Sequence, residues 1–172
     1  MMEFVQLRTD LKNKAISKGL CQPWQRKFNQ VKDKEELIKM FLAGIDFCII
    51  NNYPTPEYIE ANFKGMCEKL GVYVNEEAVL HNVRKLVFIG NCSAQLSYDS
   101  YEVAQIYVKD NSIVHVKADD HAIIMVDCFD NSKVTAKAVN GAKIIVNKYL
   151  GGQIEFIGGD VKVIEHKAKV YE

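Results

Sequence analysis

Residues 110–129, DNSIVHVKADDHAIIMVDCF, and residues 130–149, DNSKVTAKAVNGAKIIVNKY, begin with the same three residues and place apolar side chains at matched positions. The flanking blocks, 90–109 and 150–169, align with them at the same fixed interval. The aligned apolar columns are 94/114/134/154, 96/116/136/156, 104/124/144/164 and 106/126/146/166, in which only His166 is not apolar. Repetition at a fixed interval indicates an architecture in which each block stacks on the preceding one.

Each block alternates apolar and polar residues with a period of two, which is the pattern of two short β-strands separated by a turn. The turn positions recur at the same interval and are polar or small. One turn column contains Asn91, Asn111, Asn131 and Gly151, and the other contains Ser100, Asp120, Asn140 and Asp160. Asparagine suits such corners because it tolerates left-handed backbone. The repeat therefore predicts a short single-stranded β-solenoid of about four 20-residue coils.

The segment 1–70 shows helical spacing instead. Asp33 and Glu36 form a capping-box pattern ahead of an apolar stripe that extends to Ile49, and the sequence 55–57, Thr-Pro-Glu, is a second helix start. We expect three or four short helices in this part. The predicted fold class is therefore α+β, with a helical N-terminal head (1–70), a connector and first strand (71–89) and the β-solenoid repeats (90–172).

The two ends of a solenoid leave unpaired strand edges, which invite aggregation unless they are covered. The helical head precedes the first coil and is the natural cap at that end. At the other end the sequence 161–172, VKVIEHKAKVYE, interleaves charged and apolar residues. These charges either protect an exposed edge or belong to an edge that meets a second copy in a symmetric dimer. The sequence leaves both alternatives open.

Length and composition limit the class of protein. The chain has 172 residues, 48% of them apolar, and its 22 basic residues equal its 22 acidic ones. It is long enough for one full-sized domain or two small ones, and the charge balance gives no electrostatic reason to bind nucleic acid or an anionic membrane. No apolar run reaches the length of about 18 residues that a membrane span needs, and the N-terminal sequence lacks the order of a secretory signal. We therefore expect a cytoplasmic protein with no membrane partner.

The five cysteines are an odd number at wide, irregular spacing, and no C-x2-C pair is present. Reduced, mainly buried thiols are the favoured interpretation, rather than disulfides or a zinc site. Cys48 lies among apolar residues, and strand alternation places Cys128 in line with the core.

Two resemblances can be stated from these residues. The repeated coils resemble the short β-solenoids of bactofilin-like polymerising proteins, although this array is shorter and follows a helical head. The stretch 44–63, GIDFCIINNYPTPEYIEANF, followed by the solenoid, resembles uncharacterised proteins of gut bacteria (Bacteroides-type) and their mobile elements. Neither resemblance implies a catalytic residue.

The histidines offer the best case for chemistry. His115 and His121 occur in one coil beside Asp119 and Asp120, which could form a metal or acid–base cluster, and Cys128 with His121 could be a nucleophile and base. Alternation directs the His115 side chain outward and the Cys128 thiol inward, so neither is placed for these roles. A metal site would also need three or more convergent ligands. The P-loop, G-x-G-x-x-G, H-E-x-x-H and G-x-S-x-G patterns are absent from the sequence. The sequence thus predicts no catalytic residue, no metal and no cofactor.

Three hypotheses for function follow. The first is a non-enzymatic interaction or scaffold protein that associates with itself or another protein through the solenoid. The second is a small-ligand or glycan binder that uses exposed aromatic residues such as Tyr101, Tyr107 and Phe129. The third is an enzyme with a site between head and solenoid, lined by residues such as Cys21, Trp24 or His81. Nucleic acid is disfavoured because the basic cluster His115, Lys117, Lys133 and Lys137 has no aromatic neighbours for stacking.

The candidate interface is an apolar stripe on the outward positions of the second strand of each coil. Its predicted members are Val103, Tyr107, Ile123, Met125, Ile145 and Val163. Because a contiguous apolar surface is unusual on a monomer, we expect either a second chain, giving a homodimer, or the helical head to cover this stripe.

Overall fold

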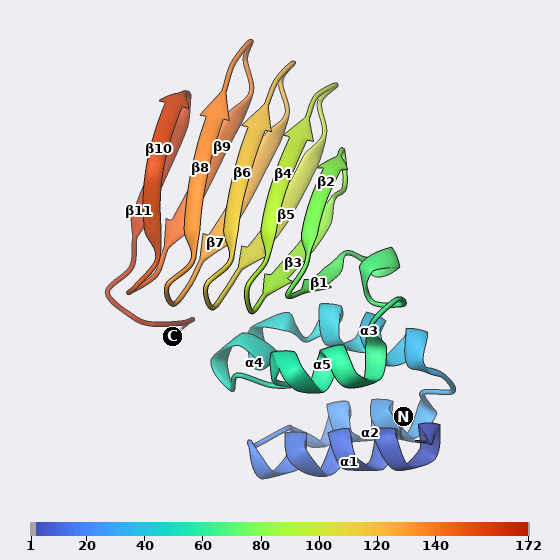
Figure 1. Cartoon of the computed structure of the whole chain (residues 1–172). Coiled ribbons are helices and arrows are strands. Elements are labelled where there is room, and N and C mark those ends of the chain that lie inside the picture. Colours follow the sequence, from blue (N-terminus) through green and yellow to red (C-terminus); the bar gives the residue numbers. More distant parts are fainter. Residues whose placement is uncertain (1–2, 172) are drawn as a thin grey trace. The chain divides into compact units, whose positions relative to one another are not determined.

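The computed structural model describes residues 3–171 and divides the chain into two compact units (Figure 1). Residues 3–70 form a helical unit, and residues 71–170 form a unit of β-strands. The α+β fold class and the β-solenoid are confirmed, since the strands are parallel and stack coil upon coil.

The helical unit contains five α-helices, one more than the largest number predicted. They are α1 (Phe4–Ser17), α2 (Gln22–Gln30), α3 (Lys34–Ala43), α4 (Ile45–Ile50) and α5 (Pro56–Phe63), followed by a 3-10 turn, η1 (Glu68–Leu70). The apolar stripe that predicted one helix is divided at Gly44, which lies between α3 and α4. A β-carbon at Gly44 would come within 3.2 Å of the Trp24 ring, so the small residue allows α2 and this junction to approach closely.

The predicted helix starts are present. The Asp33 carboxylate accepts a hydrogen bond of 2.8 Å from the Glu36 N–H, and the Glu36 carboxylate accepts one of 2.6 Å from the Lys32 N–H. The Thr55 hydroxyl accepts a hydrogen bond from the Tyr58 N–H. The Asp33 and Thr55 side chains thus supply partners to N–H groups that the first helical turn leaves unsatisfied.

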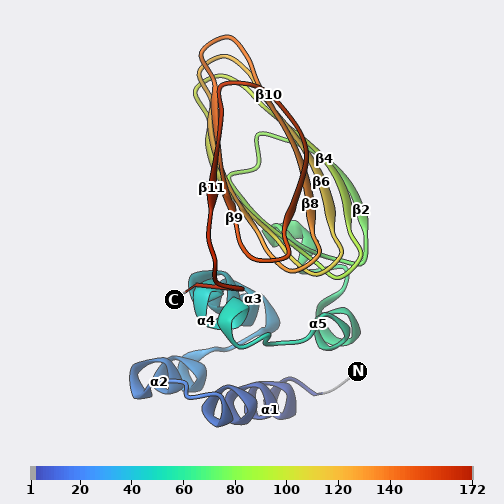
Figure 2. The same ribbon diagram turned by 90° about the vertical axis from the view of Figure 1, so that its left-hand side faces the viewer.

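The solenoid contains two parallel sheets, one on each side of the coil. The six-stranded sheet has the order β1 (Val72–Val74), β3 (Lys85–Ile89), β5 (Val103–Val108), β7 (Ile123–Cys128), β9 (Lys143–Lys148) and β11 (Val161–Glu165). The five-stranded sheet has the order β10 (Gln153–Gly159), β8 (Lys133–Ala138), β6 (Ile113–Ala118), β4 (Ser93–Tyr98) and β2 (Glu77–His81). Figure 2 shows the coils as flattened loops that overlie one another.

The columns predicted from the repeat run through the centre of the solenoid. Ala94 lies beside Val114, which lies beside Val134, and Ile106, Val126 and Val146 align in the same way across the opposite sheet. The side chains of Val114, Val126 and Val134 are completely buried. The inward apolar side chains of each coil are therefore covered by those of the next coil. In this way a repeat that cannot form a core alone becomes stable.

The corners use left-handed backbone at one of the two predicted columns, whereas in the other column it occurs one residue earlier, at Asp110 and Asp130 instead of Asn111 and Asn131. Ser100–Tyr101, Asp120–His121 and Asn140–Gly141 each have two successive positive φ angles. Each pair is closed by a hydrogen bond from the following N–H to the carbonyl that precedes the pair, as from Ala122 to Asp119 (3.1 Å). Two successive positive φ angles inside such a bond define a type I′ turn, in which asparagine, aspartate and glycine are favoured.

The solenoid starts earlier than the visible repeat. Strands β1, β2 and β3 all lie within the segment 71–89 and extend the two sheets before residue 90. From β3 to β5 the interval already equals that of the repeat, with Lys85 beside Gln105, but from β2 to β4 it is shorter, with Glu77 beside Ser93. The shorter interval hides this coil from a search at a fixed period.

The last coil departs from the predicted register. Ile154 lies beside Val134 as expected, but a β-bulge then places Phe156 beside Thr135, on the outer face. The corner between β10 and β11 consists of Asp160 alone, whereas the corresponding corner of the preceding coil spans 139–142.

The interval between β9 and β11 is consequently shorter than the repeat, so that Val161 lies beside Ile144 and Val163 beside Val146. The prediction that Phe156, Ile164 and His166 occupy the core columns is therefore wrong. So is the outward position of Val163, which packs against the core.

Candidate interaction surfaces

The outer face of the six-stranded sheet brings four residues of the predicted stripe together. Val103 lies beside Ile123, and Met125 beside Ile145. Val103, Ile123 and Met125 are exposed, at 54%, 43% and 38%, while Ile145 is half-buried. The stripe is interrupted by Lys143, which follows Ile123 in the same row. It is therefore a short apolar patch over β5, β7 and β9.

The two other predicted members do not join this patch. Tyr107 is buried, and Val163 points into the core because of the register change in the last coil. The residue beside Tyr107 in β7 is Asp127, whose buried carboxylate accepts hydrogen bonds from Asn147 Nδ2 (2.7 Å) and Gln105 Nε2 (3.2 Å). Alternation of apolar and polar residues predicts the direction of a side chain, but it does not predict these hydrogen bonds between neighbouring strands.

The last coil exposes further large apolar side chains, which the sequence did not single out. Phe156 is 55% exposed and Ile157 is 47% exposed, and Leu150 is exposed at the preceding corner. Ile157 lies beside Ala136, in a row whose members in β4, β6 and β8 are buried. It is exposed because no further coil lies over it. The signal in the sequence was His166, the one residue of the aligned columns that is not apolar.

A serine, a histidine and an aspartate lie together on the five-stranded sheet. His81 Nδ1 is 3.0 Å from Ser97 Oγ, and His81 Nε2 is 3.6 Å from Asp99 Oδ2. Asp99 also accepts a hydrogen bond of 2.8 Å from Asn82 Nδ2, and this bond is the main cause that lowers the pKa of the Asp99 carboxyl. The His81 and Asp99 side chains are 59% and 43% exposed, so solvent reaches the cluster freely. The arrangement acts as a corner bridge between β2 and β4.

The histidines that were considered as a metal or acid–base cluster do not come together. His121 stacks on Tyr101 with a ring separation of 5.0 Å, whereas His115 points outward from β6. Asp119 accepts hydrogen bonds from Asn140 Nδ2 and from the Asp120 N–H, both of 2.8 Å. Within residues 3–171, no group of three or more histidine, cysteine, aspartate or glutamate side chains is arranged to hold a metal ion.

The cysteines are mostly buried, as expected, with one exception. Cys48, Cys67, Cys92 and Cys128 are buried, and Cys21 is exposed at the start of α2. Burial raises the pKa of the Cys48 thiol to about 12, with a smaller contribution from the nearby Asp46 charge. Burial also raises the pKa of Cys128, whose sulfur lies 3.1 Å from the Ser132 hydroxyl. A raised pKa disfavours the thiolate, so these buried side chains are structural.

The aromatic residues named for glycan binding occupy different environments. Tyr101 is 71% exposed at a corner, whereas Phe129 is completely buried and stacks on Tyr149 at 4.6 Å. Tyr107 is also buried. The residues named for an enzymatic site belong to different units, with Cys21 and Trp24 in the helical unit and His81 in β2.

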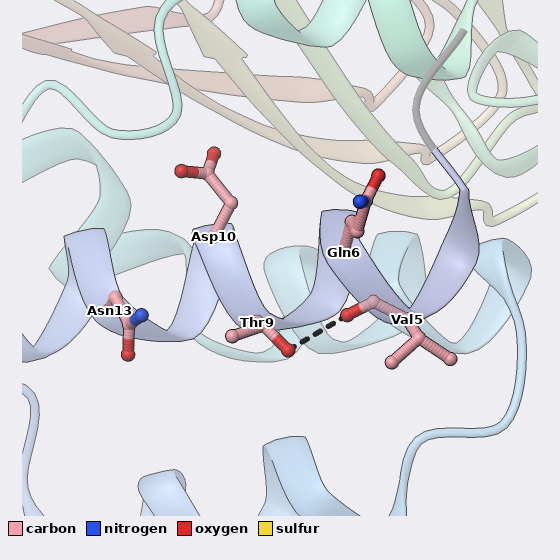
Figure 3. Close-up of a pocket in the computed structure, with 5 residues that line it drawn as sticks. All are labelled: Val5, Gln6, Thr9, Asp10 and Asn13. Carbon is pink, nitrogen blue, oxygen red and sulfur yellow. Dashed lines mark hydrogen bonds between the residues drawn. The ribbon is translucent and has the colours of Figure 1, made fainter.

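A groove of about 460 Å³ lies along α1 and is lined by Val5, Gln6, Thr9, Asp10 and Asn13 (Figure 3). The Thr9 hydroxyl donates back to the Val5 carbonyl, and the Asp10 carboxylate pairs with Lys14 at 2.7 Å. The bond from Lys14 is the main cause that lowers the pKa of Asp10. The Thr9 and Asp10 side chains are thus engaged within the helical unit.

Among residues 3–171, no helix combines the length and the apolar character needed to cross a membrane. The chain matches no protein-family model, no curated protein and no solved structure at a significant level of similarity.

Proposed function

We propose that this chain is a non-enzymatic interaction or scaffold protein that associates with copies of itself through its solenoid. One observation carries this proposal: the solenoid exposes large apolar side chains that its own fold leaves uncovered. They are Val103, Ile123 and Met125 on the outer face, and Leu150, Phe156 and Ile157 at the last coil. Clustered apolar surface of this kind marks a binding surface, and stacked repeats offer extended surfaces to other macromolecules.

The polar groups of the solenoid support the same proposal because they hold the coils together. Lys109 donates to Asp130 of the next coil at 2.8 Å, and the Asp110 carboxylate accepts a bond of 2.8 Å from the Gly90 N–H of the preceding coil. Asn111 bonds to Asn91 in the same way. Side chains that could serve chemistry thus connect one coil to its neighbour, which suits a rigid scaffold.

The test is the mass of the full-length chain in solution, measured by light scattering and sedimentation over a range of concentrations. Small interfaces commonly give affinities near the micromolar range, so the range extends from about 1 to about 100 µM. We expect a mass that rises above 19.5 kDa, the mass of one chain, as the concentration increases. A constant mass of one chain across the whole range would overturn the proposal.

A further inference from the structure

The last coil is the open end of both sheets. In the strand order, β11 is the last member of the six-stranded sheet and β10 the last member of the five-stranded sheet. Within residues 3–171, no strand pairs with the far side of either one. Two strand edges, one on each side of the core, therefore end at the same layer.

The hydrogen bonds of β11 reveal which of its backbone groups face the open edge. The Asp160 carbonyl accepts from the Ile144 N–H, and the His166 N–H donates to the Lys148 carbonyl, so both of these even-numbered residues face β9. Successive residues of a strand direct their backbone groups to opposite sides. Val161, Val163 and Glu165 therefore direct their N–H and carbonyl groups away from β9, toward the open edge.

The same layer exposes the end of the core. Val161 and Val163 pack against the core cluster but are only half-buried, unlike the fully buried Val126 and nearly fully buried Ile144 of the preceding layers. Ile157 occupies the row of Ala136 and is 47% exposed. Unsatisfied backbone groups and an uncovered core row lie together here, and a further β-layer is the structure that satisfies both.

The opposite end of the solenoid offers a poorer partner for this layer. There the six-stranded sheet ends in β1, which has three residues, against five in β11. The bulge and the short corner also give the last coil a register that the earlier coils do not share. A last coil therefore fits another last coil better than it fits the start of a second solenoid.

Two like ends can meet around a two-fold axis, and such an axis perpendicular to the stack makes the edge strands antiparallel. Strand β11 carries Lys162 near its start and Glu165 at its end. An antiparallel pair brings the start of one strand toward the end of the other, so the opposite charges approach across the axis.

The contact area is sufficient for a weak dimer. Strands of six residues are about 20 Å long and paired sheets lie about 10 Å apart; with corners and outer side chains added, the end of a coil measures roughly 30 Å by 20 Å and covers roughly 600 Å². Two such ends bury roughly 1,200 Å², which is the lower limit for specific interfaces. This size predicts an association in the micromolar range rather than a permanent dimer.

From these observations we infer that two copies of this chain join end to end, with the last coils facing one another and with β10 and β11 pairing antiparallel with the edge strands of the second copy. This inference rests on the proposed self-association and assigns it to the open end, in place of the outer-face patch of Val103, Ile123, Met125 and Ile145.

The experiment compares the masses of variants of the full chain. Val163→Pro removes an N–H group that faces the open edge, and Val163→Ala is its matched control, because it removes the same packing and retains the N–H. Phe156→Lys with Ile157→Lys places one charge on the outer face of β10 and one on the end of the core, and Met125→Lys with Ile145→Lys places two charges on the outer-face patch. Circular dichroism establishes that each variant is folded.

We expect the wild type to stop at two chains, and we expect Val163→Pro and the Phe156/Ile157 pair to weaken the dimer at least tenfold. Val163→Ala and the Met125/Ile145 pair should still dimerise. If only the Met125/Ile145 pair abolishes the dimer, the inference is wrong while self-association stands. A mass that grows beyond two chains would also overturn the two-fold dimer, and a wild type that remains a monomer would overturn both proposals. If either Val163→Pro or the Phe156/Ile157 pair is unfolded, the other variant still tests whether the last coil forms the dimer.

Discussion

The regular coils and the last coil are built from similar residues but behave differently. From β4 to β9, every strand pairs with the next strand of its own sheet in the register of the repeat, as Val114 does with Val134, and the inward side chains are almost all buried. In β10 the bulge lengthens the interval, in β11 the short corner reduces it, and the inward side chains are only partly covered. An identical interval allows identical columns to stack, whereas a changed interval ends the stack.

This difference locates a surface that composition does not reveal. Inside the solenoid, an apolar side chain is covered by the same position in the next coil. At the last coil, Ile157 has no such neighbour above it and is left exposed. We therefore expect the regular coils to carry the stability and the last coil to carry the binding.

The largest effect is expected from a charge in a regular core column. Val126→Asp places a carboxylate at a completely buried position and should cost about 4 kcal/mol or more, because an unpaired buried charge has no compensating partner. Val163→Asp, the matched change in the last coil, should cost about 1 kcal/mol, because this position is half-buried beside solvent. Urea unfolding, followed by circular dichroism at a concentration where the chain is monomeric, measures both. Equal losses of stability in Val126→Asp and Val163→Asp would show that position 163 is as well covered as the regular core.

The next effect tests stacking at a regular corner. At Gly141 φ is +82°, and an added β-carbon would collide with His121 Nδ1 of the coil before it. Gly141→Ala should therefore cost about 1–2 kcal/mol through left-handed strain and the displaced ring. In the His121→Ala background the same change should cost less, because only the strain remains. Thermal unfolding of the four proteins gives the coupling, and strictly additive costs would contradict the stacked corner.

A smaller effect is expected from the ion pair between Lys109 and Asp130. The Lys109 side chain is 10% exposed and its ammonium lies 2.8 Å from the Asp130 carboxylate, so Asp130→Asn should cost about 1 kcal/mol. The matched pair in the last coil joins Lys148 to Glu165 at 3.3 Å, with Glu165 74% exposed. Glu165→Gln should change the stability by about 0.3 kcal/mol or less. Urea midpoints measure both changes, and a larger cost at Glu165 would reverse the comparison.

The smallest effect is a pH dependence at the regular corners. The bond from Asn140 is the main cause that lowers the pKa of the Asp119 carboxyl below its ordinary value of 3.8. In acid the unfolded chain then binds this proton more readily than the folded one. The stabilisation from the bond between Asp119 and Asn140 is therefore complete above pH 3.8, and it is lost as the pH falls through the lowered pKa of Asp119.

Asp119→Asn should therefore reduce the slope of stability against pH in this acid range, and it should leave the slope unchanged near neutrality. Asn140→Gly removes the donor, retains the left-handed backbone and should have the same effect. Unfolding in urea at pH values from about 5 to about 2.5 checks this. An unaltered acid slope in both variants would show that the bond does not contribute to stability.

Much of the fold could be predicted because each regular coil repeats the previous one. A fixed interval, combined with alternation, placed Val114, Val126 and Val134 in the core without knowledge of any contact. The same reasoning placed Val163 on the outer face, because it assumed that the interval continued. A bulge after Ile154 and the shortened corner that follows it reversed that direction. A change of one residue in register is enough to exchange the two faces of a strand.

The sequence by itself therefore determined the α+β class, the helix caps at Asp33 and Thr55, the two strands of each coil and the corner residues. These features depend on local backbone preferences and on a period, and both are written in neighbouring residues. Only the tertiary structure decided where the solenoid begins and ends, and which apolar residues its last layer leaves exposed. Those properties depend on pairing between strands that lie a full coil apart in the chain, where a short corner or a single bulge changes which side chains meet.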